Sequence, residues 1–150
     1  MDTELLSVSC WLVSCAALGS YTAARDHQAA VATSDNGSGR QRVVNVVAAP
    51  GRKRRQPDAT LESVSCTAVG CTAVGGYQTK AGGDAPVAVT ESGGRWDQPV
   101  RVRLPGDAGT GRKLRAALRS VTCLDRRCTA VGVYYAVAAK VLRALVSTRR

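Results

Sequence analysis

An internal repeat of 56 to 57 residues constrains the fold of this chain more than any other feature. The string SVSC at residues 7–10 recurs at 63–66 and, as SVTC, at 120–123. A second cysteine, a glycine and a tyrosine follow each string at matching distances. Repeats of this kind are single supersecondary units that bury their apolar faces against their neighbours. We therefore expect one array, with copies over residues 5–60, 61–117 and 118–150, the third one truncated.

Each copy divides into short segments with the pattern of β-strands. In the second copy these segments span residues 61–66, 71–77, 86–91 and 96–104, and turn-forming residues separate them. The last segment alternates, with valines and a leucine on one side and arginines on the other. Alanine, valine and glycine are abundant and phenylalanine is absent, which suits thin and regular layers. The pattern predicts an all-β fold of about three tandem four-stranded antiparallel blades, the third incomplete.

Two strings of the second copy resemble a known repeat. SVSCTAVGCTAVGGY resembles a repeat of secreted bacterial β-propeller-like proteins, and VAVTESGGRW is similar to the Asp-box of BNR (sialidase-like) repeats. The resemblance implies a turn between the third and fourth strands in which an acidic side chain holds its own backbone. It also implies a propeller-like arrangement of blades. The Asp-box-like residues are Ser34, Asp35 and Gly37 in the first copy, and Thr90, Glu91, Gly93 and Trp96 in the second.

The number of copies bears on how such an array is completed. A propeller closes with four to eight blades, whereas this chain holds two full copies and part of a third. We therefore expect a partial or open β-propeller-like array. It could be a piece of a longer array, an open stack, or a protomer that closes its ring by self-association.

The six cysteines form three pairs, each with four residues between its members. They are Cys10 and Cys15, Cys66 and Cys71, and Cys123 and Cys128. Each pair flanks the expected turn between the first two strands, where opposed residues of a hairpin lie close enough for a disulfide. We predict three local disulfides and hence an oxidising, extracellular compartment. Buried free thiols and a zinc site shared by two copies are the alternatives.

The apolar run at residues 5–19 resembles the hydrophobic region of a signal peptide. Acidic rather than basic residues precede it, and the same element recurs at 61–75, where no signal could act. We interpret it as part of the first copy, so no signal peptide is visible. No run in the chain is long and apolar enough to span a membrane as a helix.

No catalytic constellation is recognisable. The only histidine, His27, is expected in a solvated loop, and the recurring Tyr21, Tyr77 and Tyr134 are interpreted as packing residues. No residue set predicts a metal site, and no motif predicts a cofactor. We therefore expect a non-catalytic extracellular repeat scaffold or binding module. The alternative from another class is a fragment of a sialidase-like glycoside hydrolase.

Basic residues indicate the kind of partner. The net charge is +10, and basic residues gather in the two connections between copies. Such clusters attract phosphate or sulfate groups, so a carbohydrate or other polyanion is the expected ligand, and an intracellular polyanion-binding protein is a further alternative. Solvated loops without a ligand are the other interpretation of these clusters. The residues concerned are Arg52, Lys53, Arg54 and Arg55 in the first connection, and Arg112, Lys113 and Arg115 in the second.

Overall fold

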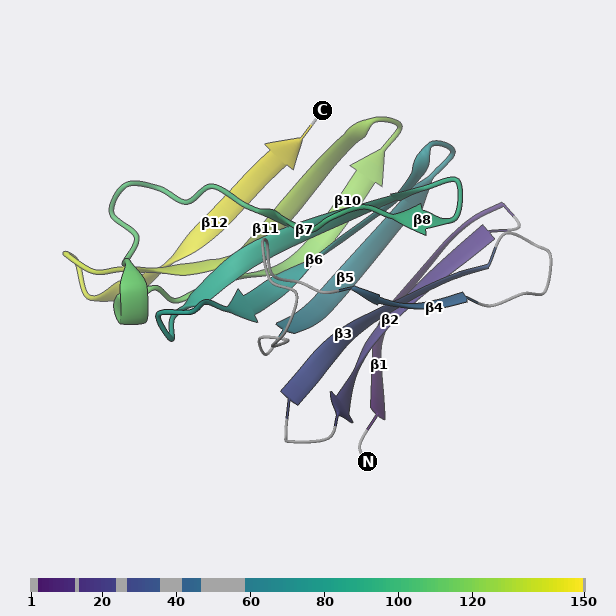
Figure 1. Ribbon diagram of the computed structural model, residues 1–150. Helices are drawn as coiled ribbons and strands as arrows, with labels where there is room; N and C mark the ends of the chain where they lie inside the picture. Colours follow the sequence, from purple (N-terminus) through teal and green to yellow (C-terminus); the bar gives the residue numbers. More distant parts are fainter. Residues whose placement is uncertain (1–2, 13, 24–26, 36–41, 47–58, 150) are drawn as a thin grey trace.

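The described part of the chain folds into antiparallel β-sheets. A computed structural model describes residues 3–12, 14–23, 27–35, 42–46 and 59–149. Three separate open sheets follow one another along the chain, in keeping with the all-β prediction, and the second lies between the first and the third (Figure 1). Each sheet begins with a hairpin, and consecutive strands pair in chain order except for β9, which pairs with β7. The period of the sequence is therefore the period of the sheets.

The strand bounds follow the repeat closely. The first sheet contains β1 (Thr3–Trp11), β2 (Ser14–Ala23), β3 (His27–Asp35) and β4 (Arg42–Val46). The second contains β5 (Ala59–Thr67), β6 (Gly70–Gln78), β7 (Asp84–Ser92), β8 (Arg95–Trp96) and β9 (Val100–Arg101). The third contains β10 (Ala116–Leu124), β11 (Arg127–Ala136) and β12 (Val141–Arg149), after a short 3-10 turn, η1 (Gly111–Lys113).

The sheets pack face to face through two apolar cores. Between the first and second sheets, Ala16 and Leu18 of β2 meet Leu61 and Val64 of β5, and Val87 of β7 lies in the same cluster. A second cluster joins the second and third sheets. These layers are filled by alanine, valine and leucine, as expected for thin β layers. The members of the second cluster are Val74, Ala116, Leu118, Val121, Ala130, Tyr134, Ala136 and Leu145.

Serine hydroxyls tie the first strands of neighbouring sheets together. Ser7 and Ser9 of β1 accept hydrogen bonds from the backbone N–H groups of Val64 and Cys66, at 3.1 and 3.0 Å. The next junction repeats the arrangement one period later. There, Ser63 and Ser65 accept from Val121 and Cys123, at 3.2 and 2.9 Å. The recurring SVSC string thus joins each sheet to the next one.

A bulge in the first strand explains the recurring glycine. The register between β5 and β6 shifts between Leu61 and Ser63, and Leu61 lies opposite Gly75. A Cβ on Gly75 would lie 1.9 Å from the Thr60 carbonyl oxygen. Equivalent register shifts occur beside Gly19 in the first sheet and Gly132 in the third. A Cβ on either glycine would again lie about as close to a backbone carbonyl oxygen. Each copy needs glycine here because two backbones approach closely, as bulged ladders often require.

Two expectations are wrong in detail. The strand expected over residues 96–104 is broken into β8 and β9, and Val102 and Leu104 lie beyond both. The Asp97 N–H still bonds to the Thr90 carbonyl of β7 at 2.8 Å, but Pro99 then interrupts the pairing because proline has no N–H to offer a ladder. His27 does not lie in a loop. It is the first residue of β3 and pairs with Ala23, since β2 extends further than its apolar pattern suggests.

Candidate binding grooves at the cysteine-turn end

All six cysteines flank the tight turns that join the first two strands of each sheet. Cys10–Cys15, Cys66–Cys71 and Cys123–Cys128 each form a disulfide with their Cα atoms 4.0 Å apart. Each pair is also directly opposed in its hairpin. The predicted disulfides are therefore confirmed, and the free-thiol and zinc alternatives are wrong for these cysteines. Disulfides of this kind are typical of an oxidising environment.

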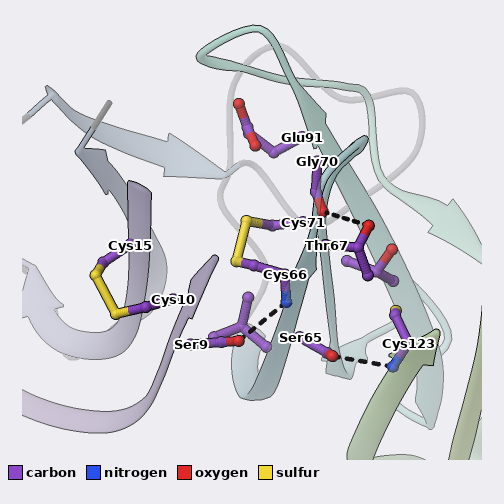
Figure 2. The surroundings of a disulfide bond; sticks show 12 residues. Ser9, Cys10, Cys15, Ser65, Cys66, Thr67, Gly70, Cys71, Glu91 and Cys123 are labelled. Atoms are coloured by element: carbon purple, nitrogen blue, oxygen red, sulfur yellow. Dashed lines mark hydrogen bonds between the residues drawn. A yellow bond between two sulfur atoms is a disulfide. The ribbon is translucent and has the colours of Figure 1, made fainter. Parts of the chain in front are cut away.

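The cysteine turn of the second sheet is closed by its own polar groups. The Thr67 hydroxyl donates to the Gly70 carbonyl at 3.4 Å (Figure 2). The same hydroxyl accepts from the Val69 N–H, also at 3.4 Å. Gly70 has a φ of 133°, a conformation that glycine adopts without strain. A Cβ there would lie 2.0 Å from the Glu91 carbonyl oxygen. The turn between β5 and β6 is thus packed directly against the end of β7.

The Asp-box-like turn of the second sheet lies beside that cysteine turn. Gly93 and Gly94 connect β7 to β8 with φ angles of 59° and 80°, as a two-residue hairpin turn with both central residues left-handed requires. The Glu91 carboxylate accepts a hydrogen bond from the Gly94 N–H at 2.6 Å. The Thr90 hydroxyl donates to the Asp97 carboxylate at 2.9 Å. These bonds hold the turn at the same end of the sheet as the disulfide.

Only part of the Asp-box-like turn of the first copy lies within the described residues. Ser34 and Asp35 are the last two residues of β3, and Asp35 lies opposite Cys15 as Glu91 lies opposite Cys71. Gly37 lies outside the described residues. Trp96 ends β8 and packs, half-buried, against the core between the first and second sheets.

A groove opens between the first and second sheets at this end. It has a volume of about 530 Å³, and the cysteine turns of both sheets line it together with the Asp-box-like turn. Trp11, Leu12 and Val69 contribute exposed apolar side chains to its walls. Glu91 contributes a buried carboxylate, already engaged with its turn. The groove therefore combines an accessible aromatic surface with backbone and hydroxyl groups.

A smaller groove occupies the equivalent place between the second and third sheets. Its volume is about 220 Å³. Val69 and Glu91 line this groove as well, and Thr90, Asp97, Asp125 and Arg126 add polar and charged side chains to it. The stacking of the sheets thus produces a groove at the cysteine-turn end of each junction, and the turn residues give each of these two grooves its own chemistry.

The basic residues of the second connection lie at the opposite end. Arg112 and Lys113 belong to η1, and Arg115 follows it; all three side chains are exposed. The Asp84 N–H donates to the Leu114 carbonyl at 2.8 Å, which fixes this segment to the start of β7 (Figure 1). Since the β5–β6 turn and the β6–β7 connection lie at opposite ends of β6, the basic segment is separated from the grooves. The cluster Arg52, Lys53, Arg54 and Arg55 lies outside the described residues.

Two polar arrangements were not anticipated from the sequence. One is the serine ladder between sheets, whose signal was the hydroxyl residue at every second position of the recurring string. The other links the buried Tyr134 to the third sheet's edge. Its hydroxyl donates to the Asp107 carboxylate at 3.0 Å, and Arg143 pairs with the same carboxylate at 2.9 Å. No periodic signal marks Asp107, because the first connection between copies carries no aspartate at the equivalent place.

The described part of the chain carries neither a metal-binding cluster nor a membrane-spanning helix. Within it, no group of three or more His, Cys, Asp or Glu side chains is placed to hold a metal ion. Among the same residues, no helix is long and apolar enough to cross a membrane. No protein-family model matches the sequence, and no curated protein matches it.

Proposed function

We propose that this chain is a non-catalytic, extracellular, β-propeller-like repeat scaffold that binds carbohydrate at its cysteine-turn end. The observation that carries the proposal is the groove between the first and second sheets, which two disulfide-closed turns frame. A ligand site built on cross-linked hairpins is held in shape before the ligand arrives, and such preorganisation lowers the cost of binding.

The lining of the groove favours a sugar over a purely apolar ligand. A pyranose ring has an apolar C–H face and a rim of hydroxyl groups. The partly exposed indole of Trp11 offers a flat surface to the first, and an indole N–H suits a polar partner. Ser14 and Thr67 bring hydroxyl groups to the same groove. Because the Glu91 carboxylate is bonded to its own turn, we assign it a structural role rather than an acid–base one.

The test is a titration of the oxidised chain with defined oligosaccharides, followed by calorimetry. Chitotetraose and cellotetraose serve as neutral probes, and sialyllactose serves as an acidic one. Trp11→Ala should weaken the binding of the best probe by about thirtyfold, the effect of removing a central aromatic anchor. Leu124→Ala is the matched control, because Leu124 holds the equivalent position in the third copy and lies outside the groove. Equal affinity for wild type and Trp11→Ala would remove the groove from the proposal.

A second candidate function rests on the basic end of the second sheet. Arg112, Lys113 and Arg115 are exposed, and none forms an ion pair with a carboxylate in the described residues. Three exposed cations close in sequence suit a sulfated or phosphorylated polymer. Retention on immobilised heparin that weakens steeply with salt, and is lost on charge reversal of these residues, would favour this function. Binding by Trp11→Ala that equals wild type in this assay would separate the two sites.

A further inference from the structure

The two outermost sheets expose faces that the inner junctions bury. Leu5 is 76% exposed on β1, whereas Leu61 and Leu118, which hold the same repeat position, are fully buried. Val8 is 67% exposed, whereas its counterparts Val64 and Val121 are 5% and 7% exposed. In the second and third sheets, these positions are covered by the preceding sheet. We call this surface of the first sheet, formed by Leu5, Val8 and the neighbouring Cys10, the head face.

The third sheet shows the opposite half of the same junction. Val131 is 44% exposed. Its counterparts Leu18 and Val74 are only 0% and 1% exposed, because the following sheet covers them. Ser120 and Thr122 hold the positions of Ser63 and Ser65, the acceptors of the inter-sheet hydrogen bonds, and both are exposed. Cross-strand pairing places Ser120 beside Val131, and Val131 beside the exposed Val146. We call this surface, formed by Ser120, Thr122, Val131 and Val146, the tail face.

We propose that the tail face of one chain binds the head face of a second copy of this chain. The inference goes beyond ligand binding and rests on the repeat, not on the groove. The internal junctions show what each face accepts. A tail-type face takes a leucine and a valine from the next sheet and gives two hydroxyl acceptors to its backbone N–H groups. Exposed apolar surface with such a defined complement marks an interaction site rather than ordinary surface.

The two halves match in chemistry as well as in position. At a junction between chains, the Ser120 and Thr122 hydroxyls would accept from the N–H groups of Val8 and Cys10. These pairs are equivalent to the 2.9–3.2 Å bonds inside the chain. The contact uses two different surfaces, so it is heterologous. When this contact is repeated from chain to chain, it gives a closed ring if the rotation between successive chains adds up to a full turn, and an open filament otherwise.

The experiment uses two variants, each blocked on one face. Val8→Lys places a charge on the head face, and Val131→Lys places one on the tail face. Both positions are exposed in the single chain, so neither variant should lose its fold, and an unchanged far-UV spectrum and melting curve check this. Val100→Lys is the matched control, because Val100 is half-exposed on β9 of the middle sheet, away from both faces.

The masses in solution decide the proposal. Light scattering over a concentration series should show that wild type and Val100→Lys associate, whereas each blocked variant stays monomeric alone. An equimolar mixture of the two blocked variants should form a 1:1 dimer and nothing larger, because one intact head and one intact tail remain. A monomeric wild type at every concentration would overturn the proposal. So would a blocked variant that still associates alone, which indicates a symmetric contact through a single face. Calorimetry with oligosaccharides on the monomeric variants tests the groove separately.

Discussion

Replacing Gly75 with alanine tests whether the bulge opposite it dictates the sequence of every copy. The added Cβ would lie 1.9 Å from the Thr60 carbonyl oxygen and 2.9 Å from the Leu61 Cα. Ordinary carbon contacts begin at about 3.5 Å, so β5 and β6 would have to part by roughly 1.5 Å. Both obstacles are backbone atoms, and no side-chain rotation relieves them.

The loss of stability in Gly75→Ala follows from the contacts that are disturbed when β5 and β6 move apart. Overpacking of a closed interior costs about 1–3 kcal/mol, and each weakened ladder hydrogen bond adds about 1 kcal/mol. We expect Gly75→Ala to lower the free energy of unfolding by about 3 kcal/mol or more. For a chain of this length, that corresponds to a fall in Tm of about 6–12 °C.

The assay is thermal unfolding of the oxidised protein followed by far-UV circular dichroism. Gly106→Ala is the matched control, because a Cβ at Gly106 meets no atom within 4 Å and its φ is not positive. That substitution should leave stability unchanged or raise it by about 0.5 kcal/mol, since alanine restricts the unfolded chain. A Gly75→Ala variant that melts within about 1–2 °C of wild type, roughly 0.5 kcal/mol, would show that the strands accommodate the Cβ and that our reasoning on the bulge is wrong.

Two further predictions concern polar contacts between elements. Ser63→Ala should destabilise the chain by about 1–3 kcal/mol, because the Val121 N–H loses its acceptor at the junction between the second and third sheets. Ser120→Ala, at the equivalent exposed position of the third sheet, should cost less than about 0.5 kcal/mol in dilute solution. Urea unfolding compares the two, and equal effects would contradict the role of the serine as an inter-sheet tie. Tyr134→Phe should cost about 1–2 kcal/mol, since the Asp107 carboxylate loses a donor; an unchanged urea midpoint would show that this bond contributes nothing.

The sequence predicted what the period controls. The fold class, the pairing of Cys66 with Cys71 and the strand order all follow from residues that recur at one spacing, because each copy meets a neighbour of the same kind. Features that occur once were harder to predict. The break at Pro99 depends on a proline that the other copies do not repeat, and the bond from Tyr134 to Asp107 joins two segments that share no pattern. The groove was also missed, since Trp11 has threonine and leucine as its repeat counterparts.

The distance along the chain between partner cysteines has a consequence for how the protein is made. Six cysteines permit 15 pairings, yet every native partner is five positions away. The nearest wrong partner, as between Cys15 and Cys66, is about ten times more distant in sequence. Loop-closure entropy then favours the native pair by roughly thirtyfold while the chain is still unfolded. Oxidation can therefore proceed copy by copy as the chain emerges, with little need for a disulfide isomerase to correct the pairing.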